Sequence, residues 1–326
     1  MTDVPAAPAP GRDPGLDPQL AGLLAMMDSA GAKMHEVSPA EARRMFRTLT
    51  VDLRDPAAVP AVESVEEIRV PGGEGELDAR LYRPHAGDLP TVVFFHGGGW
   101  VVGDLDTHDL TCRTLATLCD AVVVSVDYRL APEHPFPAPL DDALAAAHWA
   151  AEHLADLGGN DVLAVAGDSA GGNLSAVVAQ TFRDEGVALG AQLLIYPGTD
   201  MLSELPSRTE NAEGYFLDTP TMTWFAQHYL GDFPDPADPR LSPLRGELAG
   251  LAPAVVVVAQ FDPLRDEGTA YAEALAAAGV PVLVEEFAGL IHGFVDMGRH
   301  SPAAQTAVER TCEMFRSVLH RARTAP

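Results

Sequence analysis

Apolar and polar residues follow two different periods along this chain, and the change between the periods predicts its elements. Apolar positions recur at helical spacing over residues 20–27, and a second amphipathic stretch follows Ser38, whose Glu41 three places on fits a capping box. Ser64–Val70 and Glu76–Tyr82 alternate with period two and are joined by a Pro-Gly-Gly turn. We therefore expect two helices followed by an antiparallel pair of strands.

Beyond residue 90 the chain alternates between continuous apolar runs and helical patterns. The apolar runs predict strands at Thr91–Phe95, Ala121–Val126, Val162–Ala166, Ala191–Tyr196, Ala254–Gln260 and Val280–Phe287. The helical patterns lie at Thr107–Leu118, Pro139–Leu154, Ala170–Arg183, Asp266–Ala278 and Ala303–Ala322. Runs of Val, Ile and Leu connected by helices are typical of a parallel sheet covered on both faces, so we expect an α/β protein.

Two stretches do not belong to this alternation. Residues 1 to about 15 mix Pro, Gly and Asp, which bury too little surface to offset the entropy of ordering, so we expect a loose tail. The longest gap between strands, Gly198–Leu251, carries the aromatic segment Tyr215–Tyr229 and is too apolar for an ordinary loop. We expect a lid there, with aromatic residues that belong either to the core or to an acyl pocket.

Composition narrows the class of protein. With 326 residues and 47% hydrophobic content, the chain can bury a large core in one domain or two. Its formal net charge is −26 and Lys33 is its only lysine, which argues against nucleic acid or an anionic membrane surface as a partner. The acidic balance fits either adaptation to high salt or codon bias.

Cysteine usage and the N-terminal stretch bear on location. Cys112, Cys119 and Cys312 form neither a CxxC pair nor a His/Cys cluster, so we expect reduced buried thiols rather than disulfides or a zinc site. The N-terminal stretch lacks the basic and apolar parts of a signal peptide, and no stretch reaches membrane-spanning length. The sequence thus predicts a soluble cytoplasmic protein without membrane insertion.

Two glycine-rich motifs follow predicted strands directly. HGGGW at His96–Trp100 ends one strand, and GDSAG at Gly167–Gly171 ends another. A nucleophilic serine needs preset N–H donors for the oxyanion of the tetrahedral intermediate, and a glycine repeat after a strand supplies such donors. A plain helix cap at Ser169 would not need flanking glycines. Because open α/β sheets hold their active sites at this edge, the pair predicts an acyl-transfer site with Ser169 as nucleophile.

The same edge offers an acid and a base for this serine. Asp262 directly follows one predicted strand and His292 follows the last, which gives the chain order Ser, Asp, His. Asp266 competes with Asp262, but it fits a helix amino cap better. We therefore expect Asp262 to orient His292 and His292 to act as the base.

Three further polar residues are expected to have supporting roles. His96 lies on the glycine loop and is expected to pin that loop by hydrogen bonding. Asp168 precedes the serine at a sharp turn and is expected to give a hydrogen bond rather than transfer a proton. Glu133 and its neighbour His134 could suggest a metal pair, but no third ligand stands at a useful spacing, so no metal is expected.

Taken together, five motifs resemble those of the hormone-sensitive-lipase-like esterases, bacterial family IV, in the GDSAG subgroup. They are HGGGW at 96–100, DYRLAPEHPFPA at 127–138, GDSAGGN at 167–173, DPLRDEG at 262–268 and HGF at 292–294. The resemblance spans residues 51 to 320. It implies a mostly parallel eight-stranded α/β-hydrolase sheet flanked by helices, with a helical cap, no cofactor, and hydrolysis of short- to medium-chain acyl esters.

The resemblance also implies site residues and domain limits. Ser169, His292 and Asp262 would be nucleophile, base and orienter, with anion-hole N–H groups from Gly97, Gly98, Gly99 and Ala170. Substrate-pocket candidates are Trp100, Tyr196, Phe216, Leu217, Trp224 and Ile291. The tail and cap helices would occupy residues 1–50, and the catalytic domain residues 51–326, with a cap insertion at about 200–235.

Partners and alternative functions complete the sequence-based hypothesis. We expect a small-molecule ester as substrate, and the resemblance implies a possible homodimer through the last strand. An amidase, a deacetylase or a natural-product hydrolase could use the same three residues. A non-catalytic receptor of this fold is a further alternative; the gibberellin receptors resemble this family but lack the catalytic histidine, whereas His292 is present here.

Overall fold

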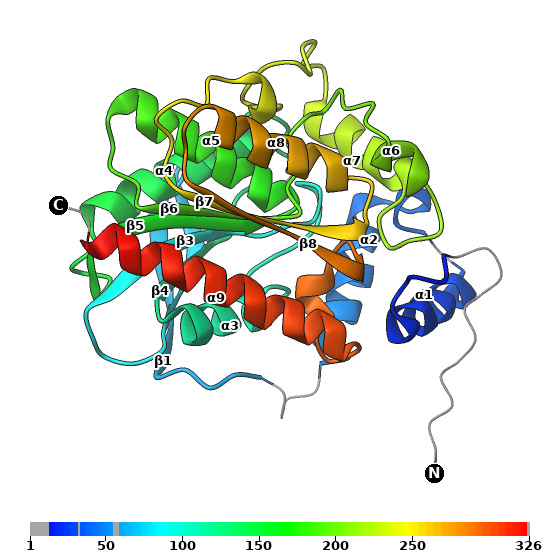
Figure 1. The fold of residues 1–326 in the computed structure, drawn as a ribbon, viewed down its shortest axis with the longest axis horizontal. Coiled ribbons are helices and arrows are strands. Elements are labelled where there is room, and N and C mark those ends of the chain that lie inside the picture. The colour runs from blue at the N-terminus through cyan, green and yellow to red at the C-terminus, as the bar shows by residue number, and fades with distance from the viewer. Residues whose placement is uncertain (1–12, 32, 55–58, 325–326) are drawn as a thin grey trace.

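The protein is built on one twisted sheet of eight strands, in the order β1-β2-β4-β3-β5-β6-β7-β8 (Figure 1). The computed structural model describes residues 13–31, 33–54 and 59–324. The strands are β1 (Ser64–Pro71), β2 (Glu76–Arg83), β3 (Leu89–Phe95), β4 (Val122–Val126), β5 (Gly159–Asp168), β6 (Ala191–Ile195), β7 (Ala254–Phe261) and β8 (Val282–Ile291). The expected loose tail falls largely outside the described residues.

Strand pairing agrees with the sequence patterns. β1 and β2 are antiparallel, β2 is antiparallel to β4, and the other neighbouring strands are parallel. Every residue of β4 and of β6 is buried, as continuous apolar strands between two helical layers require. The predicted antiparallel pair and the six parallel strands are therefore confirmed.

Helices cover both faces of the sheet. α3 and α9 lie on one face, and α4, α5 and α8 lie on the other (Figure 1). Their bounds are α3 (Asp109–Cys119), α4 (Ala138–Glu152), α5 (Ala170–Glu185), α8 (Arg265–Ala277) and α9 (Pro302–Thr324). These match the predicted helices to within a few residues at each end. The three cysteines lie free and buried in the α3 and α9 layer.

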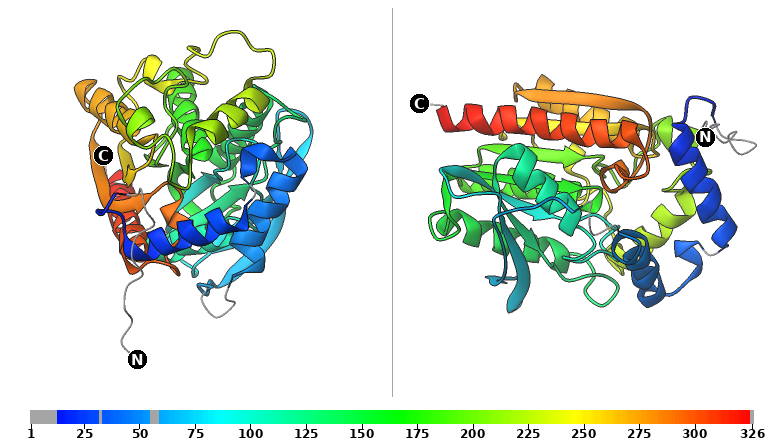
Figure 2. Two further views of the ribbon diagram at one scale, coloured as in Figure 1. Left: turned by 90° about the vertical axis from the view of Figure 1, so that its right-hand side faces the viewer. Right: turned by 90° about the horizontal axis from the view of Figure 1, so that it is seen from below.

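Four further helices of the described chain lie at the carboxyl ends of the parallel strands. They are α1 (Pro18–Ala30) and α2 (Pro39–Arg47), and, between β6 and β7, α6 (Ser207–Glu210) and α7 (Thr219–Leu230). Figure 2 shows the blue N-terminal helices and the yellow-green α7 on the same side of the molecule, facing the viewer on the left and at the right-hand end in the right view. Ser38 caps α2 as predicted, because its hydroxyl accepts the Glu41 N–H at 3.3 Å.

Arg43 of α2 fastens this N-terminal segment to loops of the sheet. Its guanidinium donates to the carbonyl oxygens of Val101 at 2.8 Å and Ala131 at 2.9 Å, and pairs with Glu133 at 2.6 Å. These contacts hold α2 against the loop that carries the glycine repeat. Within the described ranges, none of the helices combines the length and hydrophobicity needed to cross a bilayer.

Candidate active site

The turn between β5 and α5 presents Ser169 in a strained backbone conformation. Its φ is 53° and its ψ is −114°, in a region that residues with a side chain rarely occupy. Gly171 makes the turn possible, because a Cβ at that position would collide with the carbonyl oxygen of Phe95 on β3. The glycines of the GDSAG motif thus allow a sharp strand-to-helix turn that holds the serine hydroxyl above the sheet.

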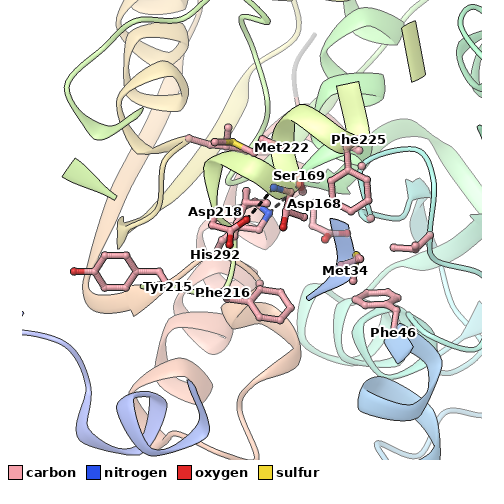
Figure 3. A pocket seen from close by; sticks show the side chains of 18 of the residues that line it. Met34, Phe46, Asp168, Ser169, Tyr215, Phe216, Asp218, Met222, Phe225 and His292 are labelled. Carbon is pink, nitrogen blue, oxygen red and sulfur yellow. Dashed lines mark hydrogen bonds between the residues drawn. The ribbon is translucent and has the colours of Figure 1, made fainter. Parts of the chain in front are cut away.

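Ser169, Asp262 and His292 come together at the carboxyl edge of the sheet. His292 Nε2 lies 2.9 Å from Ser169 Oγ, and His292 Nδ1 lies 2.7 Å from Asp262 Oδ2. His292 is 7% exposed and Asp262 is fully buried, so little water competes for these hydrogen bonds. Figure 3 shows the Ser169 and His292 side chains beside each other. With the Nδ1 proton held by the carboxylate, Nε2 is free to accept the serine proton.

The loop after β7 fixes the Asp262 carboxylate from its other side. Asp262 Oδ1 accepts the Leu264 N–H at 2.8 Å, while Oδ2 faces His292. The expectation that Asp266 caps the next helix is wrong. Leu264 is the cap residue of α8, and Asp266 lies in its first turn, where it accepts the Ser207 N–H at 2.8 Å. Asp266 is thus engaged with α6.

Three residues with potential N–H donors line the cavity beside the serine. Gly98, Gly99 and Ala170 line the same cavity as Ser169, and no acceptor within the described parts of the chain meets their N–H groups. Gly98 has φ 114°, which a residue with a side chain cannot easily adopt. These three N–H groups can therefore bind an oxyanion that forms next to Ser169.

Gly97 differs from the sequence-based expectation that it belongs to this anion hole. Its N–H donates to Asp168 Oδ1 at 2.8 Å and is therefore not available to a substrate oxygen. The predicted hydrogen bond of Asp168 thus acts on the glycine loop itself. His96 bonds to the same residue, because its Nδ1 lies 2.7 Å from the Gly97 carbonyl oxygen, which can only accept. Gly97 anchors the loop rather than facing the cavity.

His96 and Glu133 form hydrogen bonds and an ion pair that hold loops in place. Burial and the nearby His108 lower the pKa of His96 to about 4, so its ring is neutral near pH 7. Tyr128 donates its hydroxyl to the His96 carbonyl oxygen at 2.7 Å. Glu133 forms the ion pair with Arg43. Among the residues that the structure describes, no group of three His, Cys, Asp or Glu side chains could hold a metal ion.

A cavity of about 800 Å³ opens onto Ser169 and His292. Of the predicted pocket residues, Trp100, Phe216 and Leu217 line it, whereas Tyr196, Trp224 and Ile291 do not. Tyr196 and Ile291 are buried beneath the site, and the Tyr196 ring packs on that of His292 with centroids 4.5 Å apart. Trp224 turns away from the cavity on α7 and packs against His228.

The sequence motifs do not indicate the cavity-lining residues that the N-terminal helices contribute. Met34 and Phe46 reach the cavity from beyond α1 and from α2, opposite Phe216 and Phe225 (Figure 3). The amphipathic pattern of these helices predicts that one face of each is buried, but it does not show which part of the protein that face contacts. His108, which lies behind the site against Asp168, was also missed, because no motif spacing distinguishes it.

Comparison with known proteins agrees with this geometry. The α/β-hydrolase fold family matches residues 92–296. The chain is 51% identical over 243 residues to carboxylic ester hydrolase LipN of Mycobacterium tuberculosis, covering 72% of this chain and 65% of LipN. It is 42% identical over 317 residues to carboxylesterase NlhH of the same organism, covering 94% of this chain and 97% of NlhH.

A solved structure extends the similarity to three dimensions. The hyperthermophilic esterase of the archaeon Pyrobaculum calidifontis superposes with a TM-score of 0.89 at 40% identity, covering 93% of this chain and 98% of that one. The chain therefore belongs to the α/β-hydrolase family and, within it, to the hormone-sensitive-lipase-like carboxylic ester hydrolases.

Proposed function

We propose that the protein is a serine carboxylesterase in which Ser169 attacks the ester carbonyl and His292 accepts its proton. The alcohol leaves on taking that proton from His292, and an acyl-enzyme remains. Water then repeats the cycle, with His292 again as base, and releases the acid. The observation that carries this proposal is the hydrogen-bonded chain from Ser169 through His292 to Asp262, with distances of 2.9 and 2.7 Å.

Asp262 and the backbone N–H groups would stabilise the charges that develop in this reaction. The Asp262 carboxylate would hold the proton on Nδ1 and stabilise the imidazolium of His292. Gly98, Gly99 and Ala170 would donate to the oxyanion, and each donor contributes on the order of 3 kcal/mol to the transition state. Their lack of another acceptor among the described residues supports this role, because they are oriented before the charge appears.

The cavity supports short- to medium-chain acyl esters as substrates. Its walls combine apolar residues from the N-terminal helices, such as Met34 and Phe46, with Phe216 and Phe225 from the segment before and within α7. Apolar walls with a few polar groups favour a small ester over a charged polymer. The N-terminal helices and the insertion at about 200–235 would accordingly form a cap that limits the length of the acyl chain.

Two further features of the sequence-based hypothesis stay proposals. A homodimer through the β8 edge is supported by the exposure of Leu283 at 36% and Val284 at 52% on that strand. A cytoplasmic location is supported by three free, buried cysteines, which fit a reducing compartment.

Substitution of the serine tests the proposed function. Ser169→Ala should lower kcat for p-nitrophenyl butyrate by several orders of magnitude and leave the urea unfolding transition in place. Ser175→Ala is the matched control, because Ser175 lies on α5, which Ser169 precedes, and its hydroxyl donates to the Gly171 carbonyl oxygen at 2.8 Å. Undiminished turnover in the Ser169 variant would exclude it as nucleophile. Faster hydrolysis of emulsified triolein than of butyrate would contradict the acyl-length proposal.

A further inference from the structure

A buried pair of polar side chains lies behind the nucleophile, apart from the proposed triad. Asp168 ends β5 just before Ser169, and His108 precedes the first turn of α3. Their side chains are 7% and 1% exposed, and His108 Nε2 lies 3.5 Å from Asp168 Oδ1. No step of the proposed mechanism uses either group. Because burial of ionisable groups is costly, this pair needs an explanation of its own.

Asp168 connects this pair to the glycine loop. The carboxylate oxygen that faces His108 is the same oxygen that accepts the Gly97 N–H. Gly97 immediately precedes Gly98 and Gly99, which line the cavity and whose N–H groups have no acceptor among the described residues. Any rotation of the Asp168 carboxylate would therefore release Gly97 and shift the two N–H groups that follow it.

The neighbours of His108 favour a ring that is protonated on both nitrogens. Thr107 Oγ lies 2.8 Å from the Asp104 carbonyl oxygen, which can only accept, so the hydroxyl hydrogen is used there. The same oxygen lies 2.9 Å from His108 Nδ1, so Nδ1 must donate. A neutral ring would then aim the Nε2 lone pair at the Asp168 carboxylate. Protonation of Nε2 replaces that repulsion by an attraction.

The charges around the ring act in the same direction. Burial lowers the pKa of His108, but the negative charge of Asp168, together with the charges of Asp296 and Asp104, outweighs burial and raises it. Burial raises the pKa of Asp168, but the charge of His108 and the hydrogen bond from the Gly97 N–H lower it overall. The His96 ring stacks on His108 with centroids 5.2 Å apart and stays neutral near pH 7.

We propose that His108 is a positioning residue for the anion hole and acts through Asp168. Its imidazolium holds the Asp168 carboxylate, which holds the Gly97 N–H and thereby aims the N–H groups of Gly98 and Gly99 at the oxyanion. This inference rests on the proposed function, since it presumes an anion hole at these glycines. Without the cation, Asp168 is a buried carboxylate without a countercharge and no longer fixes the loop.

His108→Gln tests this role, because glutamine offers an N–H donor without the charge. We expect kcat for p-nitrophenyl butyrate to fall by about tenfold to a hundredfold, with KM changed by less than about twofold. The Ki of a trifluoromethyl ketone should rise by the same factor, because its hemiketal oxyanion uses the same donors. A purely structural role would lower the unfolding midpoint without moving kcat and Ki together.

A matched histidine controls for loss of an imidazole. His153 bonds through Nδ1 to the Trp149 carbonyl oxygen at 2.8 Å, and it precedes the start of β5. The ten residues of β5 separate it from Ser169, a distance on the order of 30 Å. His153→Gln should leave kcat and Ki unchanged. If His108→Gln also left both unchanged, the positioning role would be wrong.

A double-variant cycle tests whether His108 acts through Asp168. Asp168→Asn keeps an oxygen for the Gly97 N–H but removes the charge that His108 neutralises. The variant with both substitutions should therefore be no slower than Asp168→Asn alone. Losses of kcat that multiply in the double variant would overturn the proposed coupling.

Two further measurements keep the outcome decisive. If His108→Gln does not fold, ¹⁵N spectra of histidine-labelled wild type at pH 7.5 provide the test. They should show a doubly protonated buried ring that becomes neutral in Asp168→Asn. The absence of such a ring would overturn the proposal.

Ser169→Ala separates the positioning role of His108 from the proposed esterase function. If it loses turnover while His108→Gln keeps wild-type kcat, only the positioning role fails; if Ser169→Ala keeps full turnover, both proposals fail.

Discussion

Replacement of Asp262 by Asn would change one hydrogen-bonding atom at the end of the proposed triad. In the native chain Oδ1 accepts the Leu264 N–H at 2.8 Å and Oδ2 faces His292 Nδ1 at 2.7 Å. An amide has one accepting oxygen, which can serve only one of these positions. If the oxygen stays with Leu264, the amide NH₂ faces Nδ1, and the ring proton must move to Nε2. There it blocks acceptance of the Ser169 proton.

The opposite orientation of the amide does not restore the native state. It would place the NH₂ group against the Leu264 N–H, and an unsatisfied buried donor costs about 1–3 kcal/mol. We therefore expect Asp262→Asn to lower kcat for p-nitrophenyl butyrate by about 10⁴-fold, equivalent to about 5 kcal/mol, with little change in KM.

Asp266→Asn is the matched control for this measurement. Asp266 is four residues away but accepts the Ser207 N–H rather than facing His292, so kcat should change by less than about threefold. The assay is steady-state hydrolysis of p-nitrophenyl butyrate at pH 7.5, with urea unfolding to verify that both variants fold. The reasoning is refuted if Asp262→Asn keeps more than a tenth of the wild-type kcat.

Three further predictions concern the glycine loop, the cap and acid stability. Gly99→Ala should lower kcat about a hundredfold, because the added Cβ would collide with the Phe225 ring and displace the loop. An unchanged kcat would show that the position of this loop does not matter for the reaction. Arg43→Met should reduce the free energy of unfolding, measured in urea, by about 2 kcal/mol, because two carbonyl oxygens lose their donor. Arg44 is exposed, so Arg44→Met should leave this free energy nearly unchanged. Equal losses in the two variants would contradict the anchoring role of Arg43. Because the folded-state pKa of His96 is depressed to about 4, its contribution to stability is complete above pH 6.5 and is lost as pH falls toward 4, by about 3 kcal/mol. In His96→Asn the free energy of unfolding should therefore fall less steeply between pH 7 and 4, and an identical slope would exclude His96 as the cause.

The sheet could be predicted because most of its parallel strands are short apolar runs that alternate with helical patterns. Residues of β4 and β6 are buried on both faces, and continuous apolar runs are the direct sequence signature of such strands. The site was accessible for a related reason: its motifs follow β3, β5, β7 and β8 at the edge where parallel strands end together. Motifs that each follow a parallel strand could therefore be expected to lie close together in space.

Individual contacts were not accessible in the same way. The Gly97 N–H meets a carboxylate 71 residues further along the chain, and no local pattern reports which N–H of a glycine repeat is already bonded. Trp224 was expected in the pocket, but successive residues on a helix point about 100° apart, so Phe225 faces the cavity and Trp224 does not. Such details depend on side-chain direction, which composition and spacing leave open.

The central claim, that Ser169 is the nucleophile activated by His292, is tested most directly by covalent labelling. A fluorophosphonate should add one phosphonyl group to each folded chain, measured by intact mass, and peptide mapping should place that group on Ser169. His292→Gln should slow the labelling by orders of magnitude while the protein stays folded. Labelling of another serine, or labelling at the wild-type rate without His292, would contradict the account.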